Sequence, residues 1–356
     1  MSENTGNLLR DTLALVAPGT VLRDALERIL RGRTGAIIVL GFDDSVEAIS
    51  SGGFHLDVEL SASRLRELSK MDGAVIVDTG AGRIRRANVQ LMPSSSIETA
   101  EAGMRHRTAE RVARQTGYPV ISVSQSMQIS TLYVDGRRHV LEPSEAILAR
   151  ANQALATLER YTNRLAETSQ ALDSLEIEDL VTVRDVTAVL QLLEMVRRIA
   201  SDIDDDVIEL GTDGRLLALQ LEELTRGQMA ERDFLLSDYL PDGLDKSTVE
   251  ARLKWVGSPA LLDLAMVARA MGVGGPDGQD LDASLSPRGL RILAKIPRLP
   301  LVTARGVVEH LGSLQAVLGA TSDELQEIDG VGQRRARTLR DGLSRLAEVS
   351  VSDRYR

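Results

Sequence analysis

Residues 71–78 read Met-Asp-Gly-Ala-Val-Ile-Val-Asp, and the apolar run that starts at Ala74 is typical of a buried strand. The pair Asp72-Gly73 stands directly before this run. It can be a simple turn, or it can place a carboxylate at the edge of a sheet, where that carboxylate can hold a metal. The motif alone leaves both interpretations open.

A second segment, residues 103–108, reads Gly-Met-Arg-His-Arg-Thr and precedes a short helical stretch, residues 109–111. Two arginines, a histidine and a hydroxyl group at the N-terminus of a helix can bind a polyphosphate, because helix amides and guanidinium groups both bind phosphate oxygens. The alternative is a solvated basic loop that is capped by Thr108. Taken alone, this segment does not decide between the two.

Around these segments, residues 1–146 have the pattern of a mixed-sheet α/β domain. Thr20 is a good N-cap for a helix that Gly32 would end. Asp135-Gly136 is a turn signal after the last predicted strand. Helices are predicted at residues 20–32, 61–70 and 108–115, and strands at 35–40, 74–78, 84–91, 119–123 and 129–134.

Residues 147–286 have helical spacing of apolar residues and almost no strand signal, which predicts an all-helical middle domain with a bundle-like or spine-like role. Trp255 is expected in its core. Residues 272–287 are rich in Gly and Asp and contain two prolines, which is typical of a linker. Helices are predicted at residues 146–165, 181–199, 216–224, 249–255 and 259–271.

The net charge of −10 is unevenly distributed along the chain. Residues 1–150 are neutral, residues 151–286 carry −14 and residues 287–356 carry +4. A basic end on an acidic protein suggests a local anionic partner, although this excess is a weak signal by itself. An aspartate cluster in the middle domain could bind a cation, but a solvated helix start is favoured, since carboxylates stabilise helix N-termini. The cluster consists of Asp202, Asp204, Asp205 and Asp206.

The C-terminal segment, residues 287–356, contains an internal repeat. Residues 296–300 read Ile-Pro-Arg-Leu-Pro and residues 328–332 read Ile-Asp-Gly-Val-Gly, each followed by alanine at the same spacing. The second copy resembles the helix-hairpin-helix motif, whose glycines let the backbone approach a DNA phosphate. The first copy has Arg298 and Pro300 in place of the glycines, so it is expected to act mainly in packing. The alternative is that Gly-Val-Gly forms only a helix–turn–helix corner. DNA contacts that fix position without reading sequence are expected from Gly330, Val331, Gly332, Gln333, Arg334 and Arg335.

Composition sets further limits. The chain has no cysteine, which excludes disulfides and thiolate metal sites, and its low aromatic content of 3% predicts an aliphatic core. The first 16 residues show no signal-peptide pattern, and no apolar stretch is long enough to span a bilayer. We therefore expect a soluble cytoplasmic protein without a membrane partner.

The two N-terminal segments are much more specific together than apart. Asp-Gly-Ala followed about 30 residues later by Arg-His-Arg-Thr is the signature pair of diadenylate cyclases. With the helical middle and the hairpin repeat, the chain resembles DNA-scanning members of that family over essentially its whole length. The resemblance implies three domains, at residues 1–146, 147–286 and 287–356. It also implies a nucleotidyltransferase that condenses two ATP molecules into cyclic di-AMP and releases two pyrophosphates.

The resemblance implies a role for each residue of the site. Asp72 would hold the divalent metal, Mg²⁺ or Mn²⁺, and would serve the attacking ribose hydroxyl. Gly73 would lie against the nucleotide, Leu91 would pack on adenine, and Ser124 would lie near the triphosphate. The residues that would serve the phosphates are Arg105, His106, Arg107 and Thr108.

Two positions depart from the family pattern. The family often has threonine where this chain has Met104, so a hydroxyl is lost from the segment that would wrap the nucleotide. Some members have a basic residue where this chain has Gln125, which puts one phosphate contact in doubt. Neither departure removes the implied catalytic residues, which are Asp72, Arg105, His106 and Arg107.

Each cyclase domain would carry one site, whereas the product needs two nucleotides, so two protomers must present their sites face to face. The resemblance implies an octamer that scans branched DNA without sequence specificity, coupled to a DNA-damage checkpoint at the nucleoid. Two alternatives are a nucleotide-sensing DNA-repair module without turnover and a structural scaffold with a vestigial ATP site. The intact Asp72 and the Arg105–Thr108 run argue against both.

Overall fold

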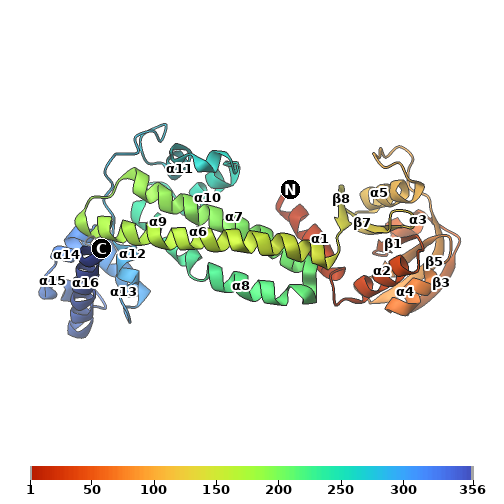
Figure 1. Cartoon of the computed structure of the whole chain (residues 1–356), viewed down its shortest axis with the longest axis horizontal. Coiled ribbons are helices and arrows are strands. Elements are labelled where there is room, and N and C mark those ends of the chain that lie inside the picture. Colours follow the sequence, from red (N-terminus) through yellow and green to blue (C-terminus); the bar gives the residue numbers. More distant parts are fainter. Residues whose placement is uncertain (1, 354–356) are drawn as a thin grey trace. The chain divides into compact units, whose positions relative to one another are not determined.

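The computed structural model describes residues 2–353, which divide into two compact units (Figure 1). The domain boundaries expected at residues 146 and 286 stay predictions. The first unit comprises the chain up to Ala154 together with Asp202–Gln220, and the second comprises Leu155–Ser201 together with the chain from Leu221 onward.

The strands of the first unit form one mixed sheet, which confirms the predicted α/β class. The strand order is β2-β5-β4-β1-β6-β7-β8, with β3 also paired to β5. Strands β1 and β4 are parallel, and the other described pairs are antiparallel. The strands are β1 (Ala36–Leu40), β2 (Ser50–Ser51), β3 (Phe54–Glu59), β4 (Ala74–Asp78), β5 (Arg83–Leu91), β6 (Val120–Ser124), β7 (Ile129–Val134) and β8 (Arg137–Leu141).

Helices cover both faces of this sheet, and alternate residues of each central strand face opposite sides. Ile38 of β1 packs in the same core cluster as α2 (Val21–Arg31) and α4 (Ala62–Leu68), whereas Val39 packs with α5 (Met104–Thr116). Figure 1 shows α5 on the face opposite α2 and α4. The buried apolar runs seen in the sequence therefore describe strands that are covered on both sides.

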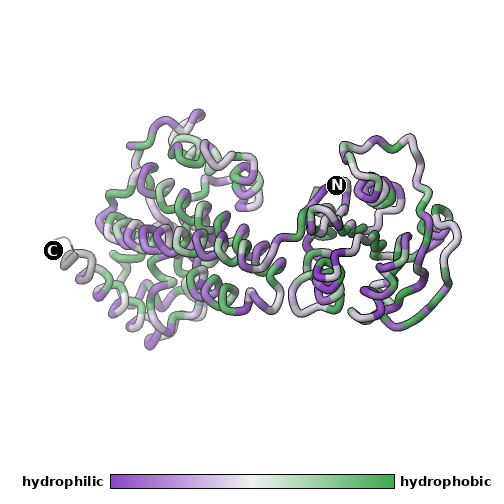
Figure 2. Tube along the Cα trace, turned by 45° about the vertical axis from the view of Figure 1, so that its right-hand side comes forward, coloured by the Kyte–Doolittle hydropathy of each residue, from purple (hydrophilic) through white to green (hydrophobic). Residues whose placement is uncertain are grey.

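The second unit is helical, with hydrophobic and hydrophilic residues alternating along its helices (Figure 2). Two long helices, α6 (Ser144–Glu178) and α7 (Val183–Leu210), contribute residues to both units. The helices that follow α7 are α8 (Arg215–Thr225), α9 (Gln228–Tyr239), α10 (Lys246–Trp255), α11 (Leu264–Met271), α12 (Leu290–Ala294), α13 (Leu301–Leu311), α14 (Leu314–Gly319), α15 (Ser322–Gln326) and α16 (Gln333–Asp353).

Sequence patterns missed several elements. The long N-terminal helix α1 (Ser2–Leu15), the short helix α3 (Asp44–Ala48) and α9 were not predicted, nor were β2, β3 and β8. The segment expected to be a linker is partly ordered by backbone pairing. The amide of Val183 donates to the carbonyl of Ala283 at 2.9 Å, and that of Leu285 donates to Val181 at 2.9 Å.

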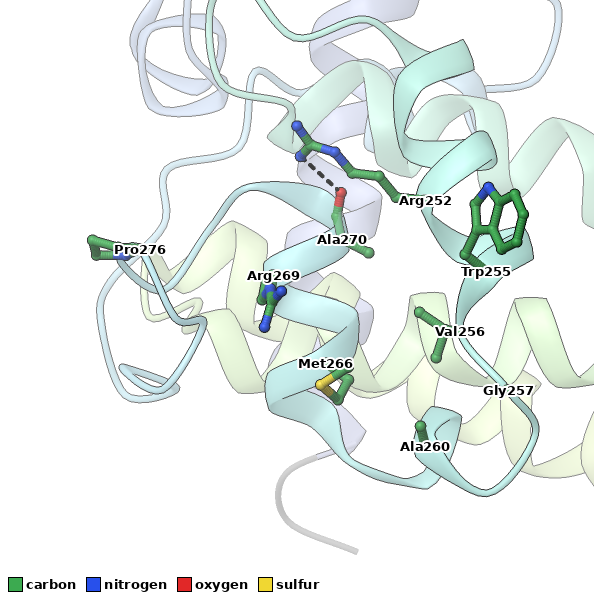
Figure 3. A pocket seen from close by; sticks show the side chains of 9 residues that line it. All are labelled: Arg252, Trp255, Val256, Gly257, Ala260, Met266, Arg269, Ala270 and Pro276. Carbon is green, nitrogen blue, oxygen red and sulfur yellow. Dashed lines mark hydrogen bonds between the residues drawn. The ribbon is translucent and has the colours of Figure 1, made fainter.

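The expectation that Trp255 is a core residue is wrong. Its side chain is 90% exposed, whereas Leu253, two positions earlier on α10, is buried. Figure 3 shows the indole of Trp255 standing at the rim of a pocket of about 570 Å³ and pointing away from Met266. A large apolar residue at the end of a helix does not by itself reveal which side of the helix it occupies.

The aspartate cluster also differs from its favoured interpretation. It lies inside α7, far from the N-terminus of that helix. Arg10 pairs with Asp204, and Arg150 pairs with Asp206 at 2.7 Å. Asp204 and Asp206 therefore pair with arginines from other helices, and the predicted position at a helix start is wrong.

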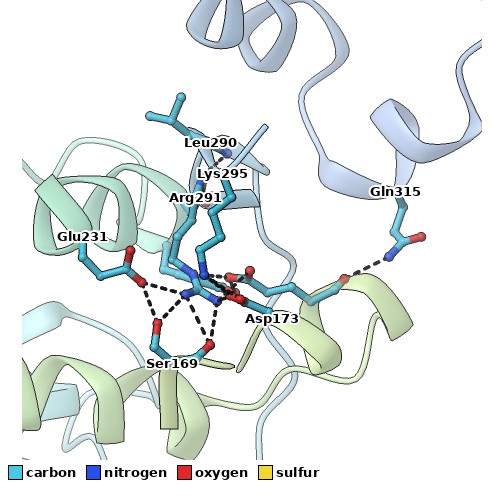
Figure 4. Close-up of polar contacts among 10 residues, drawn as sticks. Ser169, Asp173, Glu231, Leu290, Arg291, Lys295 and Gln315 are labelled. Atoms are coloured by element: carbon cyan, nitrogen blue, oxygen red, sulfur yellow. Dashed lines mark hydrogen bonds and ion pairs between the residues drawn. The ribbon is translucent and has the colours of Figure 1, made fainter. Parts of the chain in front are cut away.

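A buried arginine joins three helices of the second unit (Figure 4). Arg291, at the start of α12, is fully buried, and its guanidinium lies 2.9 Å from Glu176 of α6 and 2.7 Å from Glu231 of α9. Asp173 of α6 completes the carboxylate shell. Asp238 of α9 accepts hydrogen bonds from the backbone amides of Leu290 and Arg291. Burial raises the pKa of Asp238 to about 6. We call Arg291 with Asp173, Glu176 and Glu231 the Arg291 cluster.

Candidate nucleotide-binding site

Helix α5 begins earlier than the sequence predicted. It starts at Met104, with Gly103 as an N-cap residue that makes no side-chain cap bond. Thr108 lies in the second turn, so the interpretation of Thr108 as the helix cap is wrong. The first amides of α5 therefore lack a capping side chain, which is the arrangement that binds an anion at a helix N-terminus.

The two predicted segments meet at this helix start. Nη2 of Arg105 lies 3.6 Å from Oδ1 of Asp72, and the Asp72 side chain is fully exposed. Gly35, which the sequence analysis did not single out, makes room for this contact. A Cβ atom at Gly35 would lie 2.2 Å from Nη1 of Arg105. Only a residue without a side chain leaves the guanidinium free to lie against the start of β1.

The sheet brings the other predicted residues to one edge. Ala74 pairs with Ile37 in parallel register and with Val89 of β5, so the starts of β1 and β4 lie beside the end of β5, where Leu91 stands. Val123 pairs with Ala36, which places Ser124 at the same edge. Residues 72, 73, 91 and 124 are therefore collected at one edge of the sheet.

Gly73 fits a tight position at this edge. A Cβ atom there would lie 2.6 Å from the carbonyl carbon of Asn88. Asn88 has a left-handed φ of 56°, at an irregularity in the pairing of β4 with β5. Asn88 was missed from the sequence, because a change of strand register leaves no periodic signal. The backbone thus explains why glycine follows Asp72.

The remaining residues of the Met104–Thr108 run differ in exposure. Met104 is 84% exposed, Arg107 is exposed and Thr108 is half-buried. His106 is buried instead, with its Nδ1 2.8 Å from the hydroxyl of Tyr133. Burial lowers the pKa of His106, against the opposing effect of Glu101. The ring therefore lies inside the domain, and its expected phosphate contact stays a prediction.

The two hairpins of the C-terminal repeat have the same backbone turn. Arg298 has a left-handed φ of 65°, like Gly330 with 78°. The amide of Leu299 donates to the carbonyl of Ile296 at 3.3 Å, and the amide of Val331 donates to that of Ile328 at 3.0 Å. The replacement of glycine by Arg298 therefore does not change the turn. Val331 is buried, so its expected DNA contact stays a prediction.

A groove of about 1000 Å³ lies between these hairpins. It is rich in arginine, and Gly342 allows close packing at its base, since a Cβ atom there would lie 2.6 Å from the Ile296 side chain. Arg335 also donates to the carbonyl of Gly330, which ties α16 to its own hairpin. The cationic residues of the groove are Arg298, Arg334, Arg335 and Arg345.

In the described part of the chain, no group of three or more His, Asp or Glu side chains could hold a metal ion by itself. No helix among residues 2–353 is both long and apolar enough to cross a membrane. The metal-binding role expected of Asp72 stays a prediction.

Two family models match most of this chain. The model of the DisA bacterial checkpoint controller nucleotide-binding domain matches residues 23–138, and that of the DisA linker region matches residues 141–279. DNA integrity scanning protein DisA of Acidothermus cellulolyticus is 61% identical over 352 residues, which is 98% of this chain and 95% of that protein. The chain belongs to the DisA family. The DisA protein of Streptomyces griseus is 58% identical over 360 residues, covering 99% and 96% of the two chains. The DisA nucleotide-binding match contains Asp72, the start of α5 and Ser124.

Proposed function

We propose that this DisA-family chain is a diadenylate cyclase, which condenses two ATP molecules into cyclic di-AMP and releases two pyrophosphates. The observation that carries the proposal is the contact between Asp72 and Arg105 at the uncapped start of α5. It brings a carboxylate and a guanidinium from two separate segments to one sheet edge. The nucleotide-binding family match covers that edge.

The reaction would consist of two equivalent displacements. In each, a ribose hydroxyl loses its proton and attacks the α-phosphorus of the facing nucleotide, a new P–O bond forms, and the bond to pyrophosphate breaks. Arg105, Arg107 and the amides of α5 are suited to hold the phosphates and to balance the charge of the leaving pyrophosphate. Since one chain offers one such site, two protomers must face each other.

Asp72 fits a divalent cation of the Mg²⁺ or Mn²⁺ type. Mg²⁺ is commonly bound by one or two carboxylates and completes its shell with water and substrate phosphate oxygens, so a lone exposed carboxylate is a suitable ligand. When bound, such an ion lowers the pKa of the attacking hydroxyl and stabilises the charge on phosphate. Asp72 itself would hold and orient this ion beside the hydroxyl.

We extend the proposal to DNA. The two equivalent hairpins and their arginine-lined groove support a pair of helix-hairpin-helix motifs that grip the phosphate backbone of branched DNA without reading sequence. This fits the DNA integrity scanning named for the relatives and a role in a damage checkpoint. We also propose that the chain assembles into an octamer. This octamer would act in the cytoplasm, in association with the nucleoid.

The test is product identification. The purified chain is incubated with ATP and Mg²⁺, and the products are identified by mass spectrometry. We expect cyclic di-AMP and pyrophosphate, and no cyclic product from an ATP analogue that lacks the ribose 3′-hydroxyl. Tight ATP binding without any dinucleotide would contradict the proposal and would favour a nucleotide-sensing module without turnover.

A further inference from the structure

A chain of polar contacts crosses the otherwise apolar layer between the sheet and α5. Tyr133 of β7 is buried in that layer, and its hydroxyl donates to Oε1 of Glu101 at 2.9 Å. The same hydroxyl lies 2.8 Å from Nδ1 of His106. On its other side, Glu101 pairs with Nε of Arg138 at 2.9 Å. We call Glu101, Tyr133 and His106 the Tyr133 bridge.

The bridge determines the protonation of His106. A phenol has one proton, and here it goes to Glu101, so Nδ1 of His106 must donate to the phenolic oxygen. Burial lowers the pKa of His106, which favours the neutral ring. Nε2 of that ring is buried and has no hydrogen-bond partner among the described residues. The orientation of the ring is therefore set from the Tyr133 side.

This orientation matters because His106 lies in the first turn of α5, between Arg105 and Arg107. Consecutive helical side chains point in different directions, so a ring inserted into the domain turns its two neighbours outward. Both arginines are in fact exposed, and Arg105 reaches Asp72. The bridge thus fixes the rotation of the helix start about its own axis.

Glu101 adds a second constraint. It lies near the end of the irregular segment between β5 and α5, and side chains of α5 also bind backbone carbonyls of this segment. Arg111 donates to the carbonyl of Ile97 at 2.8 Å and Arg114 to that of Glu98 at 2.8 Å. The Tyr133 hydroxyl, which the sheet carries, therefore contacts both this segment, through Glu101, and the start of α5, through His106.

We propose that Tyr133 and Glu101 are positioning residues for cyclisation: through His106 they hold the first turn of α5, and with it Arg105 and Arg107, in register with Asp72. This inference rests on the proposed cyclase function. His106 then acts as the anchor of the phosphate-binding turn, rather than as a ligand of the phosphates. ATP can still bind when this turn shifts slightly, because the bound phosphates can move with it. The reaction is more sensitive, because the shift misaligns the attacking hydroxyl of one protomer with the α-phosphorus on the other.

The test separates turnover from binding. Tyr133→Phe keeps the ring and leaves Glu101 paired with Arg138, but removes the link to His106. We expect kcat to fall about tenfold, while the affinity for the ATP analogue without a 3′-hydroxyl stays within about threefold. Glu101→Gln, which keeps an oxygen that can accept from Tyr133, should retain most of the activity, and Glu101→Ala should resemble Tyr133→Phe.

Tyr239→Phe is the matched control. Its buried hydroxyl donates to Glu176 at 2.6 Å in the second unit, so its loss removes the same type of bond. For Tyr239→Phe we expect a fall in Tm comparable to that of Tyr133→Phe, together with an unchanged kcat. The inference is overturned if Tyr133→Phe keeps its kcat, if it loses ATP affinity in proportion to activity, or if both variants lose activity alike. Absence of cyclic di-AMP from the wild-type chain would overturn the proposed function as well, whereas an active wild type leaves that function standing.

Discussion

The Asp72–Arg105 pair and the Arg291 cluster are built from the same side-chain types in opposite settings. Arg291 is fully buried and is surrounded by Glu176, Glu231 and Asp173. Asp72 is fully exposed and lies 3.6 Å from Arg105, which is itself half exposed. The Arg291 cluster is fully paired inside the protein, and we call it the closed set. The Asp72–Arg105 pair is left accessible to ligands, and we call it the open set.

Burial separates charges that stabilise the fold from charges that can bind a ligand. A buried guanidinium must be fully paired within the fold, because an unpaired ion there is very costly. An exposed carboxylate and an uncapped helix start cost little in water, so they can remain free for a cation and for phosphates. Substitutions in the open set should therefore change activity, and those in the closed set should change stability.

The largest expected effect is on turnover. Asp72→Asn keeps the size of the side chain but removes its charge, so the proposed metal and hydroxyl contacts are lost. We expect kcat to fall by about a thousandfold or more, while Tm changes by less than about 1 °C. Rates are measured at saturating ATP and Mg²⁺, with a size check on the assembly. Near-normal turnover would leave Asp72 as a simple turn residue.

The next effect is on stability. Arg291→Met removes the cation and leaves buried carboxylates unpaired, which should cost about 3–5 kcal/mol in the free energy of unfolding. Arg184→Met is the control, since Arg184 pairs with Asp282 at an exposed site and should cost less than about 0.5 kcal/mol. Urea denaturation measures both. Equal losses of unfolding free energy in the two variants would show that the buried Arg291 cluster stabilises the fold no more than an exposed ion pair does.

The proposed DNA-binding hairpin is a second site where charge can be added without disturbing the fold. A Cβ atom at Gly332 would meet no atom of the described residues within 4 Å, so Gly332→Asp should fold normally while it places a carboxylate at the proposed phosphate contact. DNA affinity at moderate salt should fall about tenfold and should depend steeply on salt. Gly319→Asp adds the same charge at another open glycine and should bind nearly as the wild type does. Identical binding by both variants would exclude the second hairpin as the DNA-binding element.

The smallest effect concerns Trp255. Because its indole is 90% exposed, Trp255→Ala should change the free energy of unfolding by less than about 0.5 kcal/mol. Leu253→Ala, at a buried position on the same helix, should cost about 2–4 kcal/mol. A large loss from Trp255→Ala would restore the core role that the sequence predicted.

Much of the sheet could be predicted, because strands covered on both faces form uninterrupted apolar runs. The runs at Ala74–Asp78 and Ile129–Val134 gave strands with the predicted bounds. The half-exposed β3 and the edge strand β8 have no such run and were missed. Helix starts were less predictable, since the polar residues of Met104–Thr108 suit a loop as well as a first turn.

The site could be predicted only as a set of motif residues. Their pairing across the sheet edge depends on strand register, which brings Gly35 and Asn88 into the site without any local signal. Burial of His106 depends on Tyr133, which lies 27 positions later in the chain. No sequence signal showed that Arg298 adopts the same left-handed turn as Gly330, because arginine seldom does so. The packing role expected for the first hairpin stays a prediction.

The proposed reaction needs two half-sites, one on each protomer, to make one cyclic product. This requirement can be tested with mixed assemblies of wild-type and Asp72→Asn chains, prepared at known ratios with free exchange of subunits. With half of the chains wild type, random pairing predicts about one quarter of the full cyclic di-AMP rate, together with a linear dinucleotide from mixed pairs. A rate of about one half, without linear product, would show that each chain completes the reaction alone and would contradict the account.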